Sequence, residues 1–261
     1  MSCNFWLQNF SIPANVIDHL VSLCRNFLWG DKRAPIAWEK VCHPKAEGGL
    51  GLHNLKTWNL AFTSKILWDI HRKRDSLWIR WVHSYYLNNQ DFWDWSPKPR
   101  DSPLMKAVFN VKCALVEHTG RGYLARIFLL SAYKKNKFQI GVVYDLLRQK
   151  ANEAISWRFT WKPCIPRKFS FILWLALWNR LQTKDRLFLT DFEAECSLCI
   201  GHKESSHHLF FRCNFSLQVW CKIREFFGFP KNTIAIRSSI KWIRRLFMLD
   251  SVFIVTVNAY C

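Results

Sequence analysis

CSLCIGHKESSHHLFFRC, residues 196–213, contains two cysteines two residues apart, followed by a histidine and a third cysteine in an H-x4-C spacing. Two cysteines at this separation can bend around one ion, and the later His and Cys complete a tetrahedron. The pattern predicts one structural Zn²⁺. Its ligands would be Cys196, Cys199, His208 and Cys213.

Neighbouring residues leave the choice of ligands open. His207 competes with His208 because spacing alone does not separate them, and His202 and Cys221 are weaker alternatives. Chance proximity of four such residues is the competing interpretation. If three thiolates and one imidazole fill the tetrahedron, no position remains for a water to be activated, so the site is predicted to be structural.

The composition narrows the class of partner. The chain has 261 residues, and 38 lysines and arginines against 19 acidic residues give a net charge of +19. Such a field attracts polyanions, with nucleic acid as the first candidate and an anionic membrane surface as its rival. No apolar run reaches the ~18 residues of a membrane span, so no membrane partner is expected.

The cysteines also suggest a compartment. Seven of the ten cysteines are scattered outside the cluster, and MSCNFWLQNF lacks the basic start and apolar run of a signal peptide. Thiols are therefore expected to stay reduced, in the nucleus or cytoplasm.

Apolar periodicity predicts a mainly α-helical fold with little β structure. In the first expected helix, Val16, Leu20, Leu23 and Phe27 share one face. A later helix follows Pro163 and Pro166, with Phe169, Ile172, Leu173, Ala176 and Leu177 expected on its buried side. The expected helices cover residues 14–29, 56–72, 76–87, 104–118, 140–150 and 215–227, besides the one after Pro166.

Two segments between these helices read as loops. Residues 88–103 are polar with three prolines and predict a linker, in which Asp91 and Asp94 are solvated. Gly48, Gly49 and Gly51 predict a tight backbone. A phosphate-binding loop is rejected there, because neither G-x-G-x-x-G nor a following Gly-Lys-Ser/Thr is present.

Positive charge is concentrated between residues 121 and 190, where 14 lysines and arginines face three acidic residues. These side chains are candidates for phosphate contacts, and exposed rings nearby are candidates for stacking on unpaired bases. A solvated basic face is the plainer alternative. The candidates are Lys162, Arg167, Lys168, Arg180, Lys184, Arg186, Trp157, Trp161 and Trp178.

The region around the cysteines resembles a known family. Its motifs are W…W-x-P at Trp157, Trp161 and Pro163, then PRKFSF at 166–171, NRL at 179–181 and CSLC…HLFFRC followed by Val219-Trp220. This order is similar to the reverse-transcriptase zinc-binding domain, which lies at the C-terminal end of plant LINE-type (non-LTR) retrotransposon polyproteins. The resemblance implies the same four ligands, favours His208 over His207, and places Glu204 at the family's Glu. Ser197 replaces the usual Pro.

The resemblance extends upstream through FLWG and VCHPKAEGGLGLHNLKTWNLAF, which look like the segment after the polymerase domain. It implies a helical thumb-like or connecting segment followed by a small zinc-stabilised helical domain. We therefore expect four parts. They are a helical segment over 1–103, a linker region over 104–137, the zinc-binding domain over 138–228, and a basic, truncated tail over 229–261.

The polymerase of this family needs a Tyr-x-Asp-Asp turn to hold two metal ions, and no Asp-Asp pair occurs in the chain. No endonuclease or RNase H acidic constellation is visible either. The expected function is a non-catalytic fragment that binds RNA or single-stranded DNA, with a reverse-transcriptase polymerase domain as a second partner. The alternatives are a protein-interaction module packing on that polymerase, or a decayed remnant without activity.

Overall fold

A computed structural model describes residues 11–30, 34–88, 90–153, 155–163, 165–187 and 194–227. In these residues helices dominate, and the strands form one two-stranded antiparallel sheet. The predicted mainly α-helical class is therefore confirmed. None of the described helices combines the length and hydropathy needed to cross a bilayer. The predicted basic tail lies outside the described residues.

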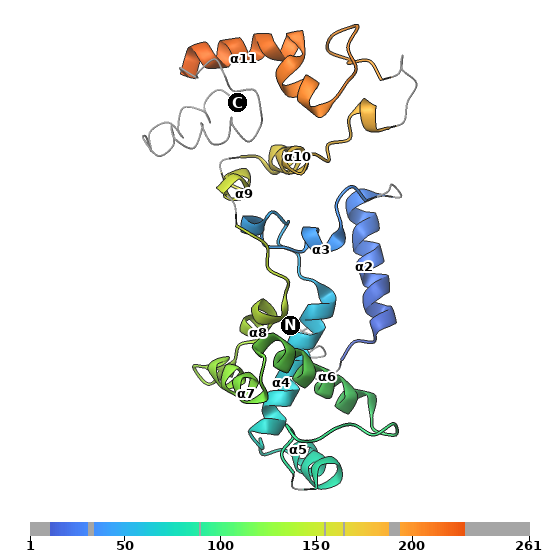
Figure 1. The fold of residues 1–261 in the computed structure, drawn as a ribbon, viewed down its shortest axis with the longest axis vertical. Coiled ribbons are helices and arrows are strands. Elements are labelled where there is room, and N and C mark those ends of the chain that lie inside the picture. The colour runs from blue at the N-terminus through green and yellow to red at the C-terminus, as the bar shows by residue number, and fades with distance from the viewer. Residues whose placement is uncertain are drawn as a thin grey trace. The chain divides into compact units, whose positions relative to one another are not determined.

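The chain folds into two compact units (Figure 1). Unit 1 comprises Met1–Ala34 and Leu52–Lys150, whereas unit 2 comprises Pro35–Gly51 and Ala151–Cys261. The chain thus leaves unit 2, builds most of unit 1, and then returns to complete unit 2.

Unit 1 is organised around α4 (Leu55–His71), which contacts both α6 and α8 (Figure 1). The side chain of Asn54 caps its first turn by accepting hydrogen bonds from the backbone N–H groups of Lys56 and Thr57. Buried residues occur all around α4 rather than on one stripe, as expected for a helix at the centre of a core. The elements around it are α2 (Ala14–Trp29), α5 (Leu77–Val82), the π-helical turn η2 (His83–Leu87), α6 (Pro103–Thr119), α7 (Gly122–Ser131), β1 (Tyr133–Lys134), β2 (Lys137–Phe138) and α8 (Ile140–Leu147).

The predicted first helix forms as α2, but its apolar face is not buried. Leu23 and Phe27 are 51% and 93% exposed, whereas Ile17, on another side of the helix, is 3% exposed. α2 contacts α4, and the side chain of Asn59 on α4 holds the backbone of Ile12 through hydrogen bonds to its N–H and C=O, both of 3.0 Å.

Residues 104–137 form α6, which matches the helix expected over 104–118, followed by α7 and the β1–β2 hairpin. Met105, Val108, Val111 and Leu115 of α6 are completely or almost completely buried. They recur every three or four residues, and this periodicity lets α6 cover one side of α4.

Residues 90–102 form no helix, as expected, yet they are not a solvated linker. Phe92, Trp93 and Trp95 belong to the core of unit 1. Asp91 accepts from the backbone N–H of Trp93 and pairs with Arg126 at 2.9 Å. Large rings made this loop part of the core, although it lacks the periodicity that marks a buried helix.

Unit 2 combines α3 (Trp38–Val41) and the 3₁₀ turn η1 (Lys45–Glu47) with α9 (Ile155–Thr160) and α10 (Arg167–Leu177). The carbonyl of Gly48 accepts hydrogen bonds from the indole N–H groups of Trp174 and Trp178, at 2.7 and 2.9 Å. The Glu47 carboxylate accepts from the backbone N–H of Ala151 at 2.9 Å. The glycine-rich segment therefore serves as a structural acceptor for aromatic residues far along the chain.

The predicted buried side of α10 is partly wrong. Ala176 and Leu177 are buried, as expected, but Phe169 is 59% exposed. Trp174 is completely buried, and its indole N–H donates to the carbonyl of Gly48. The side of α10 that carries Trp174 is therefore buried, although the expected apolar stripe did not include this residue.

Candidate metal centre

Four potential metal-ligating side chains lie together in unit 2. They are Cys196, Cys199, His208 and Cys213, and their ligand atoms all lie within 4.8 Å of one another. Cys199 Sγ is 3.1 Å from His208 Nε2. Cys199 is half-buried and the other three are buried. No other group of this kind was found among the described residues.

The first two cysteines lie on a short hairpin-like turn. The backbone N–H of Cys196 donates to the carbonyl of His202, and that of Glu204 donates to the carbonyl of Ala194, both at 2.8 Å. Gly201 adopts a φ of +93° within this turn, a conformation that glycine accepts without strain. The chain therefore folds back just after Cys199 and presents both thiols on one side.

Of the other two candidate ligands, His208 is the first residue of a single π-helical turn, η4 (His208–Arg212), and Cys213 directly follows it. The backbone N–H of Cys213 donates to the carbonyl of His208 at 2.8 Å, and this i to i+5 closure brings the two residues to the same side of the turn. Ser205 Oγ accepts from the backbone N–H of His208 at 3.1 Å and fixes the start of the turn.

Glu204 connects the metal-site turn to the preceding segment. Its carboxylate accepts from the backbone N–H of Lys184 at 3.1 Å, at the start of the 3₁₀ turn η3 (Lys184–Arg186). Lys184 Nζ donates in return to the carbonyl of Glu195 at 2.9 Å. The sequence did not reveal this bracing role, although the family motif had marked Glu204.

The weaker ligand alternatives lie outside the cluster. His207 is exposed and its ring faces Phe211 at 5.8 Å between centroids. His202 stacks on His208 at 5.5 Å, and Cys221 is exposed on α11 (Asn214–Phe227). The geometry therefore groups His208 with the three cysteines.

The environment of these groups fits a cation. Burial raises the pKa of the Cys199 thiol to about 11, together with hydrogen bonds to the thiols of Cys213 and Cys196. Burial lowers the pKa of His208, and the nearby His202 adds to this effect. A neutral imidazole is the form of histidine that binds a metal, and a bound cation would favour the thiolate form of Cys199 that a metal needs.

α11 closes this part of unit 2. The indole N–H of Trp220 donates to the carbonyl of Phe210 at 2.7 Å, and its ring stacks on Phe211 at 6.0 Å. The Phe-Phe run of η4 and the tryptophan of α11 thus form a small aromatic cluster beside the thiols. Such a cluster limits the access of water to the site.

The predicted nucleic-acid residues are not equally accessible. Trp157 is buried, stacks on Trp178 at 5.3 Å between centroids, and is therefore not available to a base. Lys184 and Arg186 donate to backbone carbonyls. Trp161 and Trp178 are half-buried, with Lys45 and Lys40 lying over their rings, and Lys162 lies over Phe159. Three candidates are exposed: Arg167, Lys168 and Arg180.

Comparison with known proteins agrees with this site. Residues 138–220 match the family described as zinc-binding in reverse transcriptase, and this range contains all four clustered residues. The chain is 40% identical over 85 residues to an Arabidopsis thaliana protein named "Putative ribonuclease H protein". The match covers 31% of this chain and only 14% of that relative. No solved structure matches.

Proposed function

We propose that the chain binds one structural Zn²⁺ through Cys196, Cys199, His208 and Cys213. The convergence of these four donors within 4.8 Å, inside the stretch that matches the zinc-binding family, carries the proposal. In a tetrahedral site with Zn–S near 2.3 Å, neighbouring ligand atoms lie roughly 3.4–3.8 Å apart, so a small contraction suffices.

Zinc in such a site supplies folding energy on the order of 10 kcal/mol and no activated water, because protein ligands fill all four positions. It would hold the turn at 194–204 against η4. Among the described cysteines, the thiols of Cys24, Cys113, Cys196, Cys199 and Cys213 are not in disulfides, and we propose a reducing location, in the nucleus or cytoplasm.

The zinc assignment is tested by elemental analysis of purified full-length protein. We expect about one zinc per chain in the wild type, and a loss of zinc in Cys199→Ser and Cys213→Ser, because three ligands bind far more weakly than four. Circular dichroism shows which preparations are folded. The matched control is Cys221→Ser, an exposed cysteine on α11, which should keep its zinc. Folded wild type without zinc, or zinc retained in both ligand variants, contradicts the assignment.

We further propose that the zinc-stabilised unit is a non-catalytic, nucleic-acid-binding part of a LINE-type reverse transcriptase. Support comes from the net charge of +19, the match to the reverse-transcriptase zinc-binding family, and the exposed Arg167, Lys168 and Arg180. RNA or single-stranded DNA is favoured over duplex, because reverse transcriptases of this kind copy an RNA template. Because the chain has no Asp-Asp pair to hold catalytic metal ions, a primer-extension assay on the chain alone should show no synthesis.

Exposed apolar side chains favour a second candidate, a module that packs on a polymerase domain or another protein. On α7, Tyr123, Ile127 and Leu130 are each more than half exposed, as are Leu23 and Phe27 on α2. An apolar interface depends weakly on salt, whereas phosphate binding weakens steeply as ionic strength rises.

Fluorescence anisotropy with a 20-nucleotide single-stranded RNA, titrated from 50 to 300 mM salt, separates the two candidates. We expect the logarithm of the binding constant to fall linearly with the logarithm of salt concentration. In Arg167→Ala/Lys168→Ala the slope should shrink by about 1.4, since each single-strand phosphate contact contributes about 0.7. Absence of RNA binding by the zinc-loaded wild type would contradict the proposal of nucleic-acid binding and would favour the protein-interaction module.

A further inference from the structure

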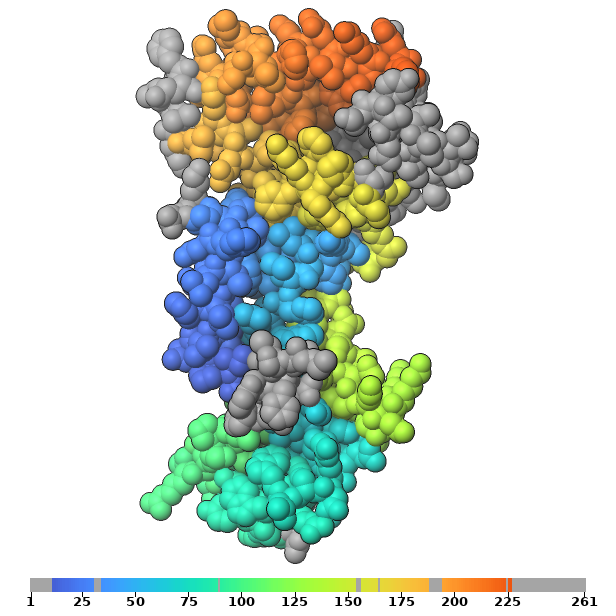
Figure 2. All heavy atoms as spheres, turned by 180° about the vertical axis from the view of Figure 1, so that it is seen from behind, coloured from blue at the N-terminus to red at the C-terminus, as the bar shows by residue number. Residues whose placement is uncertain are grey.

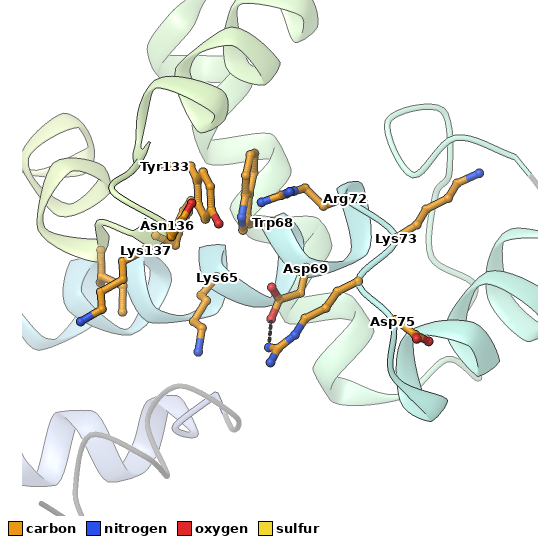
Figure 3. A pocket seen from close by; sticks show the side chains of 12 residues that line it. Lys65, Trp68, Asp69, Arg72, Lys73, Asp75, Tyr133, Asn136 and Lys137 are labelled. Carbon is orange, nitrogen blue, oxygen red and sulfur yellow. Dashed lines mark hydrogen bonds and ion pairs between the residues drawn. The ribbon is translucent and has the colours of Figure 1, made fainter.

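A hollow of about 750 Å³ lies in unit 1, and none of the residues that line it was assigned a nucleic-acid role above. It is bounded by the end of α4 on one side and by the β1–β2 hairpin on the other (Figure 3). In Figure 3, Tyr133 of the hairpin faces Trp68, and Arg72 lies beside the same tryptophan.

The lining of this hollow carries excess positive charge. Five cations line it, against the two carboxylates of Asp69 and Asp75, which leaves an excess of three. Both carboxylates are already engaged, Asp69 with Arg74 at 3.2 Å and Asp75 with Arg80 at 2.5 Å. The cations are Lys65, Arg72, Lys73, Arg74 and Lys137.

Arg72 is held in a defined position by aromatic rings. Its guanidinium carbon lies 5.4 Å from the ring centre of Trp68 and 4.7 Å from that of Tyr133. Stacking occupies the faces of a guanidinium, whereas its N–H groups point outward in the plane, so they remain suited to an anion. A preordered arginine loses less entropy when it binds a phosphate than a flexible one does.

The β1–β2 hairpin gives a second, independent indication that an anion binds here. Lys134 on β1 pairs directly with Lys137 on β2, while Tyr133 pairs with Phe138 on the neighbouring register position. Like charges directly opposite each other destabilise a sheet, so this exposed pair is a local cost to the hairpin. Lys135 is exposed at the turn, and the hairpin projects from the surface as the light green segment at the right of Figure 2.

A purely structural role explains only part of this charge. Arg72, Lys73 and Arg74 directly follow α4, where cations interact favourably with the helix C-terminus. That role does not extend to the lysines of the hairpin, which belong to a different element. An anion in the hollow would lie beside Lys137 and would offset part of its repulsion with Lys134 on the neighbouring strand.

We propose that this hollow is a phosphate-binding site for single-stranded nucleic acid, formed by Arg72 and Lys137, with Lys134 paired beside Lys137 on the hairpin. The strand would pass along the hairpin with its phosphates beside Lys134, Lys137 and Arg72. The inference rests on the proposed function for its class of ligand, but its residues lie in unit 1 and it can fail separately.

The test uses the full-length, zinc-loaded chain and the same 20-nucleotide RNA. We expect Lys134→Ala/Lys137→Ala to weaken binding at 100 mM salt about 5-fold or more and to lower the salt slope by about 1.4. The matched control is Lys98→Ala/Arg100→Ala, which removes two exposed cations of unit 1 outside the hollow. It should change affinity less than about 2-fold, as expected when only net charge is altered.

The outcomes separate this site from the zinc unit. If the hairpin variant binds like its control while Arg167→Ala/Lys168→Ala binds more weakly, the hollow is no binding site and the proposed function stands. If the wild type binds no RNA, both proposals fail. Equal displacement of the RNA by polyglutamate of matched charge would overturn the assignment to nucleic acid.

Photo-crosslinking provides a direct second readout. RNA containing 4-thiouridine should attach to peptides that include Tyr133 or Trp68, as located by mass spectrometry. Crosslinks confined to unit 2 would overturn the inference, even where the hairpin variant has lost affinity.

Discussion

Gly48 shows how one backbone position determines the packing of unit 2. Its φ is +92°, its carbonyl accepts two indole N–H groups, and a Cβ placed on it would lie 2.8 Å from the ring of Trp157. The sequence predicted a tight backbone here. It did not show the cause, because the accepted donors lie 126 and 130 residues further along the chain.

Replacement of this glycine is therefore expected to destabilise unit 2. Gly48→Ala places an alanine at positive φ, which costs about 1–2 kcal/mol, and forces the Trp157 ring to move, which adds roughly 1–3 kcal/mol. Urea unfolding followed by tryptophan fluorescence measures the change. Gly201→Ala is the matched control, since the φ of Gly201 is +93° and nothing lies within 4 Å of a Cβ added there. This variant should lose only the about 1–2 kcal/mol that an alanine at positive φ costs. Equal losses in both variants would contradict the packing argument.

At the scale of elements, the loop at residues 90–102 is held by a lysine from α6. Lys112 Nζ donates to the carbonyls of Trp93 and Trp95 at 2.7 and 2.8 Å, and also lies over the ring of Phe109. Burial lowers the pKa of Lys112, an effect that the nearby Asp94 and Asp91 oppose. A single side chain thus satisfies backbone acceptors that the loop, lacking a helix or sheet, leaves open.

Lys112→Met keeps the apolar stem but removes the donor, so it should lower the stability of unit 1 by about 2 kcal/mol, the typical value of charged hydrogen bonds. Thermal or urea unfolding detects this loss. Lys106→Met on the same helix removes an exposed bond to the carbonyl of Pro99, and its effect should stay below about 0.5 kcal/mol. A Lys112 variant as stable as the Lys106 variant would show that solvent satisfies the carbonyls.

Sequence periodicity predicted most helices because it reports local geometry. Residues 14–29, 56–72 and 140–150 formed helices close to the expected bounds. The same signal misjudged which faces are buried, as Phe27 and Phe169 show, because burial depends on distant partners. It also missed the buried Trp93 and Trp95, which lie on no regular element.

The candidate metal site was more accessible to sequence reasoning. C-x2-C and H-x4-C contain nearly all of the geometry, since the four residues span only 196–213. The sequence did not predict the hydrogen bonds that hold the site in place. Glu204 and Lys184 brace it through backbone groups, and backbone hydrogen bonds carry no residue signature.

At the scale of the whole molecule, unit 2 is discontinuous, since Pro35–Gly51 joins Ala151–Cys261. A fragment that starts at residue 138, where the family match begins, lacks Gly48. The indole N–H groups of Trp174 and Trp178 would then have no carbonyl acceptor in the fragment.

This discontinuity also sets a time order during synthesis on the ribosome. Trp38 and Val41 are at most 7% exposed in the folded unit, yet they leave the ribosome about a hundred residues before α9 and α10, which belong to the same unit. At roughly 5–20 residues per second, that interval lasts about 5–20 s. During it, unit 1 can complete its core, while the nascent Trp38 and Val41 remain exposed to chaperones or to other newly made chains.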